Sequence, residues 1–121
     1  MKNNILVLII GGLLSILLSC NQVFEKPLEN DSVELTAPVN NLVTTIQNNT
    51  FAWEELNGAL NYRLQIVSPR FDSIARFVID STVNRTNLNL TLDTGKYEWR
   101  VKGLNNSSSS LYSVPRTFTI Q

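Results

Sequence analysis

Histidine is absent from this chain, and cysteine occurs once, at position 20. Without histidine no Ser-His-Asp triad can form, and the common transition-metal sites lose a main ligand. A single cysteine cannot form an intramolecular disulfide. The sequence also lacks a phosphate-cradling glycine loop and an Asp-x-Asp-x-Asp-Gly calcium loop. We therefore expect no metal, no cofactor and no catalytic centre.

An excess of positive charge is also missing. The 121 residues include ten Lys or Arg and ten Asp or Glu, so the formal net charge is zero. Nucleic-acid binding depends on a basic surface that neutralises phosphates, so no nucleic-acid partner is expected. The length suits a single domain with one small core.

The longest apolar run lies at the N-terminus. After Lys2, residues 5–18 are apolar except for two glycines and one serine, and polar residues begin after Cys20. A charged start, an apolar run and a polar continuation are typical of a secretory signal peptide. Fourteen helical residues rise about 21 Å against roughly 30 Å of bilayer hydrocarbon, so a membrane-spanning helix is poorly supported. We predict that residues 1–19 are a cleaved signal peptide.

The only cysteine stands where the apolar run ends. The tetrapeptide Leu17-Leu18-Ser19-Cys20 resembles the lipobox of bacterial lipoproteins, with a leucine three residues before the cysteine and a small residue directly before it. The resemblance implies a diacylglyceryl group on the Cys20 sulfur, cleavage before Cys20, and acylation of the new amine by a fatty acid such as palmitate. Two or three acyl chains, at about 0.8 kcal/mol per buried methylene, hold a protein on a membrane far more firmly than one. An ordinary signal peptide with a chance cysteine is the alternative.

Residues 20–32 are predicted to be the lipidated cysteine and a flexible tether. Pro27 and several acidic or amide residues leave little apolar content in this stretch. Twelve extended residues reach at most about 40 Å, which would let the domain stand clear of the lipid. The predicted location is the cell envelope of a Gram-negative bacterium, with the protein lipid-anchored in the outer membrane and the leaflet left open.

Residues 33–121 alternate between apolar and polar side chains, as in β-strands, instead of repeating at helical spacing. One dry face and one wet face are typical of antiparallel sheets that pack over a shared core. Seven strands are expected, at residues 33–36 with a continuation at 42–46, and near 51–53, 62–66, 77–80, 88–92, 97–101 and 118–120. Turn signals such as Asn57-Gly58 and Thr94-Gly95 separate them. The sequence therefore predicts an all-β, seven-stranded antiparallel β-sandwich.

Several of these residues resemble the fibronectin type III family, and especially its variants on cell-envelope lipoproteins of Bacteroidetes. The resemblance runs from about Glu34 to Ile120, although Thr94 stands where many members carry a proline. The residues that carry it are the second-strand tryptophan Trp53, the turn Asn57-Gly58-Ala59 before Tyr62, and Leu92, Gly95, Tyr97 and Trp99 of the LxxGxYxWRV segment. It implies an immunoglobulin-like sandwich in which the Tyr97 hydroxyl returns to nearby backbone as a corner tyrosine.

A type III topology gathers the loops after the second, fourth and sixth strands at one end, which here are residues 54–60, 84–87 and 105–112. The last of these loops is the main candidate for partner binding, because amides and hydroxyls beside an aromatic ring offer adaptable contacts. The candidate residues are Asn105, Asn106, Ser107, Ser108, Ser109, Ser110 and Tyr112. The alternative is a solvated loop whose Tyr112 starts the last strand.

All four aspartates precede serine or threonine. Three of these sites resemble the Asp-Ser/Thr-apolar O-glycosylation motif of Bacteroidetes envelope proteins, with Ser32, Ser73 and Ser81 as the acceptors. The alternative is that Asp-Ser pairs simply begin tight turns.

The sequence favours a lipid-anchored, non-catalytic module for binding, adhesion or spacing, with an envelope protein or a glycan as partner and a glycan-handling assembly as one setting. A small enzyme or enzyme inhibitor that acts through the sandwich loops is the alternative. Glu54-Glu55 is the only adjacent carboxylate pair, but neighbouring strand residues point to opposite faces, whereas glycoside hydrolysis needs two facing carboxylates. A purely structural stalk is a third hypothesis.

Overall fold

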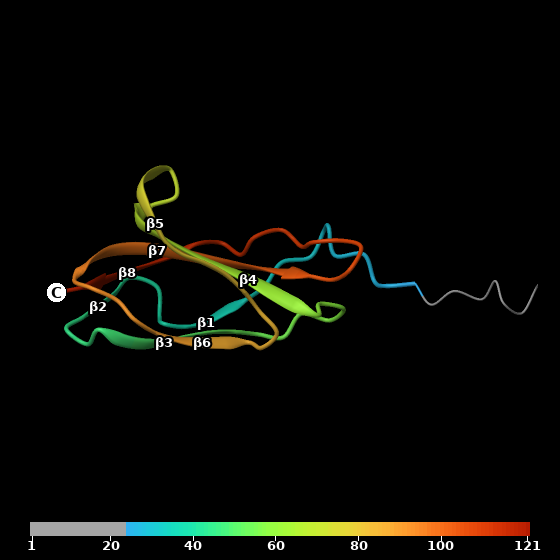
Figure 1. The fold of residues 1–121 in the computed structure, drawn as a ribbon, viewed down its shortest axis with the longest axis horizontal. Helices are drawn as coiled ribbons and strands as arrows, with labels where there is room; N and C mark the ends of the chain where they lie inside the picture. Colours follow the sequence, from blue (N-terminus) through green and yellow to red (C-terminus); the bar gives the residue numbers. More distant parts are fainter. Residues whose placement is uncertain (1–23) are drawn as a thin grey trace, which may run out of the picture.

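The computed structural model describes residues 24–121, so the predicted signal peptide, lipobox and Cys20 lie outside the described residues. The strands are β1 (Leu35–Ala37), β2 (Leu42–Thr44), β3 (Asn48–Trp53), β4 (Asn61–Arg70), β5 (Ser73–Val83), β6 (Asn87–Thr91), β7 (Gly95–Leu104) and β8 (Arg116–Ile120). They form a three-stranded sheet in the order β1-β3-β6 and a five-stranded sheet in the order β2-β8-β7-β4-β5. Figure 1 shows the two sheets as facing layers. Within residues 24–121, no helix is long and apolar enough to span a bilayer.

The first expected strand and its continuation are two strands in different sheets, so the strand count is eight and not seven. β1 pairs with β3 in antiparallel orientation, whereas β2 pairs with β8 in parallel, which corrects the expectation of an antiparallel sandwich throughout. Pro38 lies between β1 and β2 and has no N–H to donate to a ladder. Asn41 then turns the chain with a positive φ of 64°. These two residues carry the chain from one sheet to the other.

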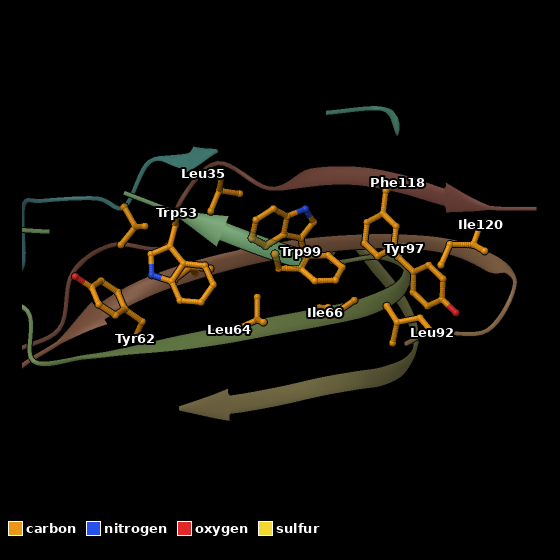
Figure 2. Close-up of a cluster of buried hydrophobic side chains, with 13 residues drawn as sticks. Leu35, Trp53, Tyr62, Leu64, Ile66, Leu92, Tyr97, Trp99, Phe118 and Ile120 are labelled. Atoms are coloured by element: carbon orange, nitrogen blue, oxygen red, sulfur yellow. The ribbon is translucent and has the colours of Figure 1, made fainter. Parts of the chain in front are cut away.

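Alternating apolar side chains from both sheets fill the space between the layers, as predicted (Figure 2). The Phe51 and Trp99 rings meet edge to face with centroids 5.1 Å apart, which is a favourable arrangement for aromatic pairs. Core residues that are at most 7% exposed are Val33, Leu35, Phe51, Trp53, Tyr62, Leu64, Ile66, Leu92, Tyr97, Trp99, Val101, Phe118 and Ile120. The predicted alternation is therefore confirmed on β3, β4, β7 and β8.

Tyr97 is the corner tyrosine that the sequence indicated. Its hydroxyl donates a hydrogen bond of 2.6 Å to the backbone carbonyl of Asp93, four residues earlier. Its ring stacks on Phe118 with centroids 5.0 Å apart and an interplanar angle of 14°. The side chain thus closes the β6–β7 turn onto the core.

The β4–β5 hairpin is longer than the sequence indicated. β5 spans eleven residues at one edge of the five-stranded sheet, and the hairpin tip stands away from the two layers (Figure 1). The β4–β5 register shifts twice, once between Ile66 and Val67 and once between Ser68 and Pro69. Such irregularities bend and twist a strand pair. The hairpin therefore leaves the plane of the sheet near its tip.

Candidate binding surfaces

The loops at residues 54–60, 84–86 and 105–111 meet at one end of the sandwich, which we call the loop end. The Trp53 N–H donates to the Thr86 carbonyl at 3.0 Å, and the Leu60 N–H donates to the Leu104 carbonyl at 2.7 Å. At Gly103, an added Cβ would lie 2.8 Å from the Leu56 side chain, so the first loop packs directly on β7. The expected gathering of these three loops is present in the fold.

The loop end is covered by residues 25–32, which belong to the stretch that the sequence predicts to be a tether. Asn105 Nδ2 donates to the Lys26 carbonyl at 2.8 Å, and the Leu28 N–H donates to Ser108 Oγ at 3.0 Å. The Leu111 N–H donates to the Asp31 carbonyl at 2.9 Å. These contacts make residues 25–32 part of the folded unit.

Leu28 explains why this segment lies on the domain. Its side chain is fully buried although its neighbours Pro27 and Glu29 are both exposed. It packs on Gly58, where φ is +90° and an added Cβ would lie 3.3 Å from Leu28 Cδ2 and 3.0 Å from Lys26 Cβ. Burial of one leucine side chain contributes roughly 1.5–3 kcal/mol, which favours docking over a free tether. Sequence periodicity could not find this contact, because a single apolar residue forms no pattern.

The polar residues of the predicted binding loop are hydrogen-bonded within the protein. Asn105 Oδ1 accepts from the backbone N–H groups of Ser107 and Ser108, at 3.1 and 2.8 Å. Ser110 is 7% exposed, and its Oγ accepts from the Gly103 N–H and donates to the Leu111 carbonyl. These hydrogen bonds hold the loop together.

Two further candidate residues of this loop, Ser109 and Asn106, make contacts through their backbone. Ser109 forms an isolated backbone bridge with Leu104. Asn106 is exposed and uses its backbone N–H to bond Glu25 Oε2 at 3.1 Å.

Tyr112 lies away from the other loop candidates, against the outer face of the five-stranded sheet. The Arg100 guanidinium carbon sits 4.0 Å from the centroid of the Tyr112 ring and 4.0 Å from that of Phe71. Lys102 Nζ is 4.9 Å from the same Tyr112 ring. Cations over aromatic faces are attracted by the ring quadrupole. The structure thus places Tyr112 in a stack with Arg100 and Phe71.

A polar ladder continues from Arg100 across this outer face. Arg100 donates twice to Gln65 Oε1, at 2.9 and 3.1 Å, and Gln65 Nε2 lies 3.4 Å from Asp80 Oδ2. Arg63 forms a two-pronged pair with Asp80, with both N–O distances 2.8 Å. The hydrogen bonds from Arg63 lower the pKa of the Asp80 carboxyl below its ordinary value, and the same bonds raise the pKa of Arg63.

One concavity lies at the opposite end of the domain from residues 25–32. It is a groove of about 440 Å³ between the end of β4 and the start of β7, lined by Arg70, Lys96, Thr117 and Thr119 among others. A second groove of about 410 Å³ lies between residues 32–35 and residues 113–116. Both volumes fall in the range of small-ligand sites.

The remaining predicted sites are scattered over the surface. Glu54 and Glu55 are both exposed. Ser73 is exposed at the hairpin tip and Ser32 is exposed before β1, whereas Ser81 is half-buried. In the described part of the chain, no group of three or more His, Cys, Asp or Glu residues is arranged to hold a metal ion.

Solved structures with a similar fold are fibronectin type III domains. The fibronectin type III domain of a human fibronectin type III domain containing protein 3 matches with a TM-score of 0.53 at 15% identity, covering 83% of this chain and 92% of that one. Fibronectin(III)-like modules of CbhA from Clostridium thermocellum match with a TM-score of 0.47 at 15% identity, covering 73% and 92%. No protein-family profile and no curated protein matches the sequence. The described residues therefore have a fibronectin type III-like fold, and identity at this level establishes the fold alone.

Proposed function

We propose that this chain is a lipid-anchored envelope protein whose single domain is a non-catalytic binding, adhesion or spacer module. The observation that carries the proposal is the coincidence of three features at one point of the sequence: the end of the apolar run, the lipobox-like Leu17-Leu18-Ser19, and the only cysteine. The docked segment is in keeping with it, because Glu25, five residues after Cys20, is already bonded to the domain. The outer membrane of a Gram-negative bacterium is the proposed location.

The anchor is tested on protein from the membrane fraction by mass spectrometry of its N-terminal peptide. We expect a diacylglyceryl group on the Cys20 sulfur, an acylated amine and no residue before Cys20. Cys20→Ala should abolish both processing and membrane attachment. Ser15→Ala, which changes a residue of the apolar run outside the lipobox, is the matched control and should leave both unchanged. An unmodified Cys20 in membrane-bound protein would contradict the proposal.

A binding role, with an envelope protein or a glycan as partner, is favoured by the groove beside Arg70 and Lys96. Two cationic residues and two threonines, Thr117 and Thr119, line this groove. Cationic side chains form strong hydrogen bonds with anionic groups, so a polar or anionic ligand fits this lining. Cross-linking in intact envelopes, followed by recovery of the protein, separates binding from spacing. We expect a stoichiometric partner that is lost in Lys96→Ala and kept in Lys102→Ala. Recovery of no partner would favour the spacer role.

A further inference from the structure

Residues 25–31 lie against one end of the sandwich, and a lipid anchor at Cys20 would bring that same end to the membrane. Residues 25–31 are bonded to the loop end through Glu25, Lys26, Leu28 and Asp31. From Cys20 to Glu25 there are five residue steps, which reach at most about 18 Å when fully extended. A lipid on Cys20 would therefore hold the loop end close to the bilayer surface. In Figure 1 the C-terminus lies at the opposite end of the domain.

The loop end also carries exposed apolar side chains. Leu60 is 53% exposed and Leu111 is 57% exposed, and both belong to the loops that form this end. Phe24 is 88% exposed and directly precedes Glu25, which is bonded to Asn106 of the loop end. The polar side chains of Asn105, Ser108 and Ser110 are engaged in bonds within the protein. Apolar side chains next to an acyl anchor add membrane affinity when they enter the headgroup region.

We propose that the loop end is a membrane-contacting surface, with the bilayer as its occupant and Phe24, Leu60 and Leu111 as the side chains that enter the interface. This inference rests on the proposed lipid anchor at Cys20. Its consequence is that the domain stands on the membrane in one orientation, with the groove beside Arg70 and Lys96 facing away from the lipid. The anchor and the docked segment together set this orientation.

The test uses the full lipidated protein in phosphatidylcholine vesicles that contain headgroup-region spin-labelled lipid. Acylation blocks the native Cys20 sulfur, so a new cysteine can be labelled alone with an environment-sensitive fluorophore. Leu60→Cys and Leu111→Cys report on the loop end. Ile46→Cys is the matched control, because it is a 63% exposed apolar residue in the β2–β3 loop at the opposite end.

We expect the labels at positions 60 and 111 to shift to shorter emission wavelength and to lose fluorescence to the spin-labelled lipid, while the label at position 46 does neither. Vesicle flotation of the same samples separates the two proposals. Protein that floats but shows equal quenching at all three positions overturns the membrane-contacting surface and leaves the anchor intact. Protein that does not float overturns both.

Discussion

The indole of Trp53 lies between the two sheets, and its ring centroid is 5.7 Å from that of Tyr62 (Figure 2). The side chain is only 3% exposed. Protein interiors are close-packed, so a truncated tryptophan leaves a cavity that neighbours fill only in part. Its contribution is therefore to packing between the layers, at the end of β3 that leads into the loop end.

At this residue scale, Trp53→Ala should lower the free energy of unfolding by about 3–5 kcal/mol, because both apolar burial and packing are lost. Urea denaturation of the soluble domain measures the change. Val114→Ala is the control, because Val114 is 86% exposed and should change stability by no more than about 0.5 kcal/mol. Similar midpoints for the two variants would mean that Trp53 does not contribute to the core.

Asp80 makes stability depend on pH on the acid side. Its pKa is lowered in the folded state by the hydrogen bonds from Arg63, so folding favours the ionised carboxylate. The stabilisation is present above the unfolded-state pKa near 3.9 and is lost as the pH falls through the lower folded-state pKa. The pair is solvent-exposed, so the effect should be small.

We expect Asp80→Asn to flatten the loss of stability below about pH 4 relative to the unmodified domain, because the titrating group is gone. Urea midpoints between pH 6 and pH 2 measure this. Asp72→Asn serves as control, because its partner Arg70 is 3.3 Å away and its carboxyl is 76% exposed. If the urea midpoint of Asp80→Asn falls with pH as it does in the unmodified domain, the hydrogen bonds from Arg63 do not contribute to stability.

At the scale of elements, Asn105 joins three segments. Its Nδ2 donates to the carbonyls of Lys26 and Gly58, and its Oδ1 organises the serines that follow it. Asn105 thus joins the docked segment to the loops at residues 54–60 and 105–112. The hydrogen bonds of this one side chain link segments that are not paired as strands of a sheet.

Asn105→Ala should lower stability by about 0.5–1.5 kcal/mol, because part-buried backbone groups of Gly58 and Ser108 lose their hydrogen-bond partner. It should also speed amide hydrogen exchange in residues 25–32. The adjacent Asn106→Ala is the matched control, because Asn106 contributes its backbone N–H and not its side chain. Equal exchange in the two variants would mean that the segment is held by other contacts.

For the whole molecule, the docked segment sets where the folding unit begins. A soluble protein that starts at Phe24 should be more stable than one that starts at Val33 by about 2–4 kcal/mol, since the shorter chain loses the buried Leu28 and its backbone bond to Ser108. Both should fold as β-sandwiches, because the main core cluster begins at Val33. Thermal and urea unfolding compare them, and equal stability would make the segment a passive tether.

Leu28→Ala in the longer protein isolates the apolar part of this difference. We expect a loss of about 2–3 kcal/mol, which is most of the stability difference between the protein that starts at Phe24 and the one that starts at Val33. Pro27→Ala is its control, because Pro27 is exposed. A small effect in both variants would assign the gap to the hydrogen bonds.

The sequence alone determined the sandwich, its aromatic core and the corner role of Tyr97. Alternation with a period of two is a local pattern, and it specifies which face of each strand is buried before any partner strand is known. The spacing of Gly95, Tyr97 and Trp99 resembles that of fibronectin type III domains, and this resemblance predicted the turn and the hydrogen bond from the Tyr97 hydroxyl to nearby backbone. Cys20 stays a prediction, because it lies outside the described residues.

Only the tertiary structure decided the candidate surfaces. Leu28 lies in a polar stretch, and its partner Ser108 is 80 positions away, so no local pattern could pair them. Tyr112 follows the serine loop in sequence, yet its ring stacks on Arg100 of β7, because the chain after the loop turns back over the outer face of the sheet. Likewise, the move of β2 to the other sheet depends on its pairing with β8. Contacts between distant segments form only where the fold brings their surfaces together, and their energy is absent from any local stretch of sequence.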